Sequence, residues 1–149
     1  MGSHSCTVGL FRPMMATVRI QKAVLEAILR HAQAESPLEC CGLLSGEAGL
    51  ITQHHPMRNS VRSESRYEIE PFELFQFFRD LRATQRKHLG IYHSHPHSEA
   101  YPSSIDIQQS FYPDCAYFIV SLKDSSTPRV QAFRIADQPV QELEIVVEI

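Results

Sequence analysis

Two stretches of the chain place apolar residues at helical spacing. Within residues 21–34 they recur so as to share one face of a helix: Val24, Leu25, Ile28, Leu29 and Ala32. A second helix is predicted from Pro71 to about Lys87, because Leu74, Phe75, Phe78 and Leu81 recur at helical spacing. Pro71 suits its first turn, where a residue without an N–H leaves no hydrogen bond unmade. Its four phenylalanines are expected to lie in the core or on a covered face. A shorter helix is predicted from Ser103 to about Phe111.

Most other apolar runs have the length and alternation of strands. Residues 116–122 are continuously apolar, which is typical of a central strand buried on both faces. The other expected strands are residues 17–20, 40–44, 51–57, 90–93, 129–135 and 143–149. Because strands occur at both ends of the chain, a purely parallel, doubly wound sheet is disfavoured. The pattern predicts an α/β domain with a mixed, curved sheet.

The composition limits what this domain can be. The 149 residues correspond to one domain, and neither a repeat nor a linker divides them. We take residues 15–149 as the domain and residues 1–14 as a tag or disordered start, because the chain begins like an expression scar. A net charge of −3 argues against a nucleic-acid partner, and no apolar run is long enough to span a membrane. The irregularly spaced cysteines favour a reduced, cytoplasmic chain: Cys6, Cys40, Cys41 and Cys115.

Histidine is concentrated in one segment. Of the eight histidines, four lie within ten residues: His88, His93, His95 and His97. If the strand at residues 90–93 continues, His93 and His95 point to the same face and can bind one metal ion. Asp106, at the start of the predicted short helix, would complete a set of two histidines and one aspartate. Three protein ligands leave a fourth position to water, which is the mark of a catalytic zinc site.

Hydrolysis also needs a base, and Glu39 is the candidate. It lies beside a small, apolar segment, where a carboxylate is unusual for a surface residue. Within reach of the metal's water, it would act as base and then as acid to the leaving amine. Ser103 would donate a hydrogen bond to the oxyanion. Two-histidine, one-carboxylate sets also bind iron, but a nearby glutamate favours hydrolysis and therefore zinc.

Each of these residues also has an ordinary structural explanation. A single histidine is more often a surface or core residue than a ligand. Ser103 with Asp106 also fits a helix N-cap followed by a first-turn acid. His97 is left out of the ligand set because a proline interrupts the strand before it. Cys40 and Cys41 are expected to be inert buried thiols rather than ligands or nucleophiles.

At these positions the sequence resembles the JAMM, or MPN-plus, metallopeptidases. The motif of that family is an early glutamate, then His-Ser/Thr-His-Pro, then Ser-x-x-Asp, with seven residues between the second histidine and this serine. The chain has Glu39, HSHP at residues 93–96 and SSID at residues 103–106. Residues 37–46 (PLECCGLLSG) also resemble the glutamate segment of the family. The resemblance extends over nearly the whole chain after Met15.

The resemblance implies a fold and a role for each residue. His93, His95 and Asp106 would hold Zn²⁺ together with a water molecule. Glu39 would be the general base and acid, and Ser103 would steady the oxyanion. The implied fold is the JAMM/MPN fold, a three-layer α/β/α domain with a mixed, curved sheet that is related to the cytidine deaminases.

The resemblance also implies a substrate class. The reaction would be hydrolysis of a peptide or isopeptide bond after the C-terminal Gly-Gly of a ubiquitin-like protein. The compact chain is similar to small stand-alone prokaryotic members, which implies a sulfur-carrier protein as a second kind of partner. A homodimer is a further expected association. The alternative is a non-catalytic MPN-type binding or assembly module, which the aromatic side chains of the helix predicted at residues 71–87 would serve.

Overall fold

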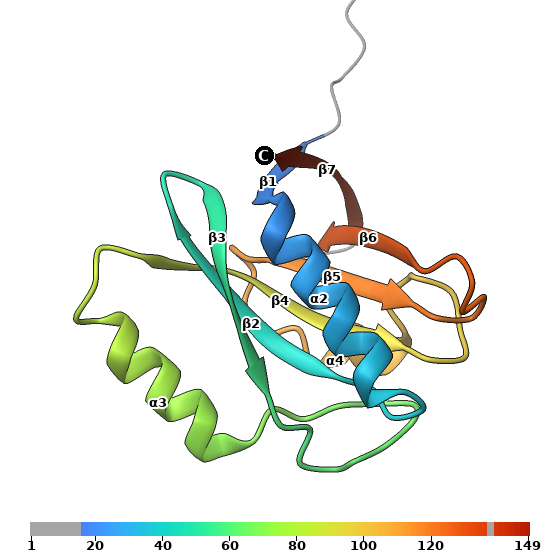
Figure 1. Ribbon diagram of the computed structural model, residues 1–149. Coiled ribbons are helices and arrows are strands. Elements are labelled where there is room, and N and C mark those ends of the chain that lie inside the picture. The colour runs from blue at the N-terminus through green and yellow to red at the C-terminus, as the bar shows by residue number, and fades with distance from the viewer. Residues whose placement is uncertain (1–15, 137–138) are drawn as a thin grey trace, which may run out of the picture.

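The computed structural model describes residues 16–136 and 139–149, and these contain three helices and seven strands (Figure 1). In chain order the elements are β1 (Thr17–Gln21), α2 (Lys22–Glu35), β2 (Cys41–Glu47), β3 (Leu50–Met57), α3 (Pro71–Leu81), β4 (Lys87–His95), α4 (Ser104–Gln108), β5 (Ala116–Ser121), β6 (Arg129–Arg134) and β7 (Gln141–Glu148). The tag expected at residues 1–14 lies outside the described residues. None of the described helices has the length and apolar character needed to cross a membrane.

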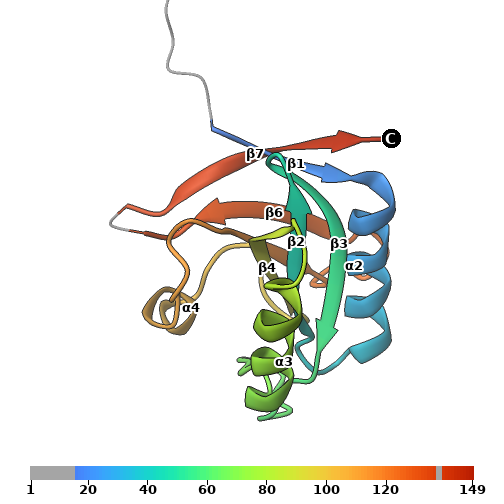
Figure 2. The same cartoon turned by 90° about the vertical axis from the view of Figure 1, so that its left-hand side faces the viewer.

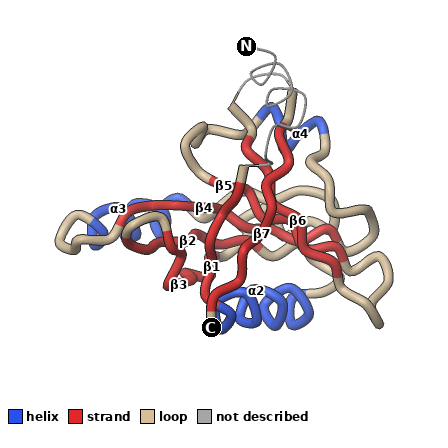
Figure 3. The backbone as a smooth tube through the Cα atoms, turned by 90° about the horizontal axis from the view of Figure 1, so that it is seen from above, coloured by secondary structure: helices blue, strands red, loops and turns tan. Residues whose placement is uncertain are grey.

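The described strands form one sheet that closes into a barrel in the order β1-β3-β2-β4-β5-β6-β7. Closure comes from β1, which pairs in parallel with both β3 and β7. β4 and β5 are also parallel, and the other neighbours are antiparallel. Seen from above, β1 and β7 run side by side (Figure 3). The expected α/β content and mixed sheet are confirmed. The three-layer description is not confirmed, because pairing of the first and last strands closes the sheet.

α2 covers one hydrophobic core, on the side of the sheet away from α4 (Figure 2). Its apolar face buries Val24, Ile28 and Ala32. They pack in a cluster with Ile20 of β1 and Phe118 of β5. Burying a large aliphatic side chain contributes about 1.5–3 kcal/mol, so this face accounts for the position of the helix. The helical face predicted from the apolar periodicity is confirmed.

α3 begins where the sequence predicts and ends earlier. A proline occupies its first position, and the carboxylate of Glu70 accepts a hydrogen bond from the N–H of Glu73 at 3.0 Å. The prediction that this helix reaches about Lys87 is wrong, because the helix ends at Leu81. The chain from Lys87 onward pairs with β2 as strand β4 instead. Strand pairing across the sheet therefore outweighs the local helical preference.

The four phenylalanines of α3 divide between core and solvent. Phe77 is buried and Phe78 partly buried in a second hydrophobic cluster, which also contains Ile91 of β4. Phe72 and Phe75 are 62% and 57% exposed. The expectation of a core or covered position is therefore wrong for these two side chains.

His88 of β4 is enclosed by aromatic rings. It lies edge-on to Phe77, Phe78 and Tyr112, with ring centroids 5.4, 5.2 and 5.0 Å away. Its Nε2–H donates to the carbonyl oxygen of Gly90 at 3.0 Å. Burial lowers the pKa of His88 from 6.5 to about 4. The folded protein therefore holds this histidine neutral at pH 7.

Candidate metal centre

Strand β4 brings two histidines together at its C-terminal end. His93 and His95 are two residues apart on the strand, so their side chains share a face. Both are buried, with 1% and 4% of their surface exposed. Their Nε2 atoms lie 3.1 Å apart. Pairing with β2 on one side and β5 on the other holds the strand in place. The prediction that the strand continues through both residues is confirmed.

Asp106 reaches the histidines from the first turn of α4. Ser103 is the N-cap: its Oγ accepts the N–H of Asp106 at 3.1 Å, and Oδ2 of Asp106 accepts the N–H of Ser103 at 2.9 Å. The same Oδ2 lies 3.1 Å from Nε2 of His93 and 3.0 Å from Nε2 of His95. The N-cap alternative is therefore right. It does not compete with a ligand role, because the reciprocal capping bonds orient the carboxylate toward β4.

The three side-chain atoms form a nearly equilateral triangle with sides of 3.1, 3.1 and 3.0 Å. Ligand atoms at about 2.0–2.1 Å from a tetrahedral zinc ion stand about 3.3 Å apart. Two imidazole nitrogens and one carboxylate oxygen are also a donor set that zinc prefers. In the part of the chain that the structure describes, this is the one group of three or more His, Cys, Asp or Glu residues close enough to share an ion. The residues present therefore fit zinc.

The two imidazoles are supported differently. The Nδ1–H of His95 donates to the carbonyl oxygen of Glu99 at 2.7 Å, which leaves the lone pair of Nε2 for a metal. Nδ1 of His93 is buried and has no hydrogen-bond partner among the described residues. Instead, the ring of Tyr67 stacks on His93, with centroids 4.5 Å apart and an angle of 25° between the ring planes.

Charge interactions keep the aspartate ionised. Burial by itself would raise the pKa of Asp106, but the charge of His93 and hydrogen bonds from both histidines hold that pKa well below its usual range. Burial lowers the pKa of His93. Burial acts in the same direction on His95, but hydrogen bonds to Asp106 and Glu99 outweigh it and raise the pKa. The pKa shift of His93 thus favours the neutral imidazole that a metal needs, whereas a proton on His95 would have to leave before an ion could bind there.

Glu39 lies just before β2, close to the two histidines. Cys41, two residues later, pairs with His93 in antiparallel register, and the N–H of Ser94 donates to the carbonyl oxygen of Cys40. The carboxyl group is 3% exposed, and its Oε1 has no hydrogen-bond partner in the described parts of the chain. Burial raises the pKa of Glu39 to about 8, with His95 opposing the shift and Asp106 adding to it. A carboxyl group that titrates near neutrality suits proton transfer.

Two polar side chains that the sequence analysis missed hold the backbone around Glu39. Oγ of Ser94 accepts the N–H of Cys40 at 2.8 Å. Nδ2 of Asn59 donates to the carbonyl oxygen of Glu39 at 3.2 Å. The signal for Ser94 was its place between two candidate ligands on a buried strand. Asn59 had no comparable signal, because it lies in an irregular segment between β3 and α3.

Other candidates lie outside this group. His97 is exposed, and its Nε2 lies 2.8 Å from a carboxylate oxygen of Glu64, which agrees with its exclusion from the ligand set. Cys40 and Cys41 are buried free thiols. Burial raises the pKa of Cys40 to about 12 and that of Cys41 still further above its ordinary value. Neither is a thiolate at neutral pH, as the sequence analysis expects.

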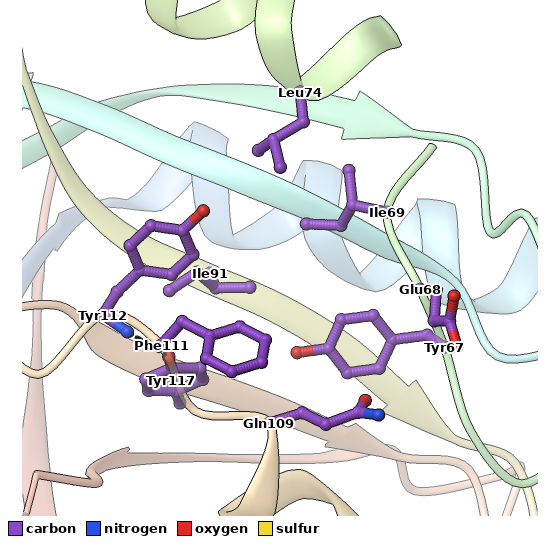
Figure 4. A pocket seen from close by; sticks show the side chains of 9 residues that line it. All are labelled: Tyr67, Glu68, Ile69, Leu74, Ile91, Gln109, Phe111, Tyr112 and Tyr117. Atoms are coloured by element: carbon purple, nitrogen blue, oxygen red, sulfur yellow. Dashed lines mark hydrogen bonds between the residues drawn. The ribbon is translucent and has the colours of Figure 1, made fainter. Parts of the chain in front are cut away.

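A cavity of about 380 Å³ lies between α3 and α4, and its lining includes Tyr67 but none of the three triangle residues. Tyr67 separates it from His93, and the hydroxyl group of Tyr67 points into the space toward Phe111 (Figure 4). Ile91, two residues before His93, forms part of the wall together with Tyr112 and other side chains. The Tyr67 ring therefore contacts His93 with one part and borders the cavity with another.

Comparison with known proteins identifies the family. Residues 21–136, which include every candidate site residue, match the family described as prokaryotic homologs of the JAB domain. The chain belongs to this family. This JAB-domain chain is 34% identical over 125 residues to the CysO-cysteine peptidase of Mycobacterium tuberculosis, a match that covers 83% of the chain and 86% of that relative.

A second JAB relative is the desampylase of Haloferax volcanii, which is 32% identical over 131 residues, covering 83% of this chain and 91% of the relative. Among solved structures, a protein from Desulfitobacterium hafniense superposes with a TM-score of 0.80 and 31% identity. That match covers 89% of this chain and 93% of the other protein. The JAB chain thus matches each of these three proteins over most of its length.

Proposed function

We propose that this JAB protein is a zinc-dependent peptidase or isopeptidase that hydrolyses the bond after the C-terminal Gly-Gly of a ubiquitin-like or sulfur-carrier protein. The observation that carries the proposal is the convergence of His93 Nε2, His95 Nε2 and Asp106 Oδ2 into one buried triangle. We assign these residues as the zinc ligands, with Glu39 as general base and acid. When bound, zinc acidifies water and polarises a carbonyl group.

The buried carboxyl group of Glu39 is suited to move the proton that hydrolysis transfers. Its pKa is raised to about 8, and its Oε1 lacks a partner among the described residues. Glu39 accepts a proton from the attacking water and returns it to the leaving nitrogen, which departs as an amine. Water thereby supplies OH to the acyl carbon and H to the nitrogen.

Ser103 is suited to stabilise the oxyanion. In the capping box its Oγ accepts a hydrogen bond from the N–H of Asp106, so the hydroxyl hydrogen remains free to donate. We assign that hydrogen to the oxygen that gains negative charge when water adds to the carbonyl group.

The preference for a glycine tail rests on access to the ligands. His93 and His95 are almost fully buried, so the scissile bond has to approach closely, and glycine allows close approach of the backbone. The relatives named CysO-cysteine peptidase and desampylase support a small ubiquitin-like or sulfur-carrier partner. We place the reaction in the cytoplasm, where the free thiols of Cys40, Cys41 and Cys115 would persist.

Metal content and cleavage test the proposal together. The wild-type protein, purified without a histidine tag, is expected to hold about one zinc ion per chain and to cleave a carrier fusion after Gly-Gly. Glu39→Gln should keep the metal and lose cleavage, because the amide cannot act as a base, whereas His95→Ala should lose both. A fusion with Ala-Ala in the tail is the matched substrate control. Wild-type rates for Glu39→Gln, or after zinc removal with EDTA, would refute the assignment.

The exposed side chains of Phe72 and Phe75 on α3 support a second candidate, a non-catalytic binding or assembly module. Such a module would retain its partner, or a second copy of the chain, in the presence of EDTA. Substituting both phenylalanines with serine would weaken that association. A wild-type protein that holds no zinc and takes up none on titration would favour this candidate over hydrolysis.

A further inference from the structure

His93 lacks the polar contact that usually orients a metal-binding histidine. Such residues almost always donate their second ring N–H to a carboxylate, a carbonyl oxygen or water, which fixes the tautomer and the ring orientation. His95 follows this rule through the carbonyl oxygen of Glu99. Nδ1 of His93 is buried and has no partner in the described parts of the chain. Another contact therefore has to fix the ring that provides one corner of the triangle.

Tyr67 supplies a contact of the right geometry. Its ring lies nearly parallel to the imidazole of His93, with 4.5 Å between centroids and 25° between planes. Offset-stacked aromatic rings attract each other beyond the effect of burying their surface. His95 meets the same imidazole edge-on, with centroids 4.9 Å apart. The ring of His93 is therefore held between an aromatic face and a second ligand.

The side chain of Asn59 holds Tyr67 at this point. Its Nδ2 donates to the carbonyl oxygen of Arg66 at 3.1 Å, and its Oδ1 accepts the N–H of Glu68 at 3.1 Å, so the residues on both sides of Tyr67 are anchored. The same Nδ2 donates to the carbonyl oxygen of Glu39. One buried amide thus connects the backbone of the proposed base with the backbone of the residue that stacks on a proposed ligand.

We propose that Tyr67 is a positioning residue of the metal centre, which stacks on His93 in place of the absent hydrogen bond at Nδ1, and that Asn59 keeps it there. This role rests on the proposed function, because it assumes that His93 is a ligand. The ring carries the role. The hydroxyl group points into the cavity, toward Phe111 (Figure 4).

Metal affinity of matched variants tests the role without relying on catalysis. Tyr67→Phe keeps the ring and should bind Zn²⁺ like the wild type in competition with a chromophoric chelator. Tyr67→Leu removes the stack and should bind about 10–100-fold more weakly, the usual effect of losing an outer contact of a ligand. It should also change the visible absorption spectrum of the Co²⁺-loaded protein. Phe111→Leu, which alters another side chain of the same cavity, is the control and should change neither.

Two results would overturn this role while leaving the metal centre intact. One is wild-type zinc affinity and an unchanged Co²⁺ spectrum in Tyr67→Leu. The other is equal weakening in Tyr67→Phe, which would assign the effect to the hydroxyl group. A wild-type protein that binds no zinc would instead overturn the proposed function, and this role with it.

A measurement on the metal-free wild type covers the case in which Tyr67→Leu does not fold. Protons over the face of an aromatic ring resonate upfield, so the Hδ2 signal of His93 should be shifted upfield in the wild type and in Tyr67→Phe. A His93 signal at the ordinary position in the wild type would refute the stacking.

Discussion

Ser103 combines two tasks that substitution can separate. Its Oγ caps α4 by accepting the N–H of Asp106, and under the proposed function its hydroxyl group also donates to the oxyanion. Replacing an N-cap serine with alanine costs about 1 kcal/mol of stability, whereas glycine costs only a few tenths. Losing an oxyanion donor lowers kcat by about 10²–10³-fold, or about 2.7–4 kcal/mol. Ser103→Gly should therefore fold almost normally and turn over very slowly.

The assay is kcat for cleavage of a Gly-Gly carrier fusion, with zinc content and thermal midpoint measured for each variant of Ser103. Ser103→Thr keeps both the cap and the hydroxyl group and should resemble the wild type. Ser103→Ala should lose stability as well as rate. A fully zinc-loaded Ser103→Gly within about fivefold of the wild-type kcat, which is under about 1 kcal/mol of barrier, would refute the oxyanion role. A parallel loss of zinc would trace the effect to Asp106 instead.

Three further predictions concern stability. His88 has a pKa of about 4 in the folded protein, against 6.5 for the free side chain. Between these two pH values the unfolded chain binds a proton that the folded chain does not bind. The free energy of unfolding should therefore fall as the pH is lowered from 6.5 toward 4. In urea unfolding of the metal-free proteins, the free energy of unfolding of the wild type should decrease over this pH range by up to about 3 kcal/mol more than that of His88→Phe. An equal decrease in both proteins would contradict the prediction. Gly42→Ala should cost about 1–3 kcal/mol, because its Cβ would lie 2.3 Å from the buried ring of Tyr92; an unchanged urea midpoint would count against it. Zn²⁺ at 100 times its Kd should stabilise the wild type by about 2.7 kcal/mol, and the same Zn²⁺ concentration should stabilise Asp106→Asn far less. Thermal unfolding with and without EDTA measures both effects. Equal stabilisation of the two proteins would remove Asp106 from the ligand set.

Local patterns predict the parts of the fold that depend on local sequence. The buried face of α2 and the burial of β5 follow from the spacing of apolar residues, because each element has a regular period along its own sequence. The end of α3 at Leu81 does not follow, because residues 82–86 contain no breaker and the start of β4 is decided by pairing with β2. Closure of the sheet was unpredictable for the same reason, since it depends on two strands at opposite ends of the chain.

The same distinction applies to the candidate site. His93 and His95 could be brought together from the strand period alone, and their Nε2 atoms do lie side by side. Asp106 and Glu39 could be proposed from residue type and neighbourhood, but their approach to the histidines could not be derived. It depends on a capping box and on the path of the chain just before β2. Tyr67 reaches His93 from an irregular segment, whose path is set by side-chain hydrogen bonds that no periodicity encodes.

Closure of the sheet also bears on how the protein is made. β1 finds β7 only after the last strand has been synthesised, although the two pair from Thr17 with Glu144 to Gln21 with Glu148. Until then β1 and β6 each present an unpaired edge, which is a template for association with other nascent chains. Every proposed site residue precedes residue 107, yet a chain that stops before β7 is expected to aggregate rather than form a smaller working domain. We therefore expect the metal site to become usable only after β7 has been made and has paired with β1.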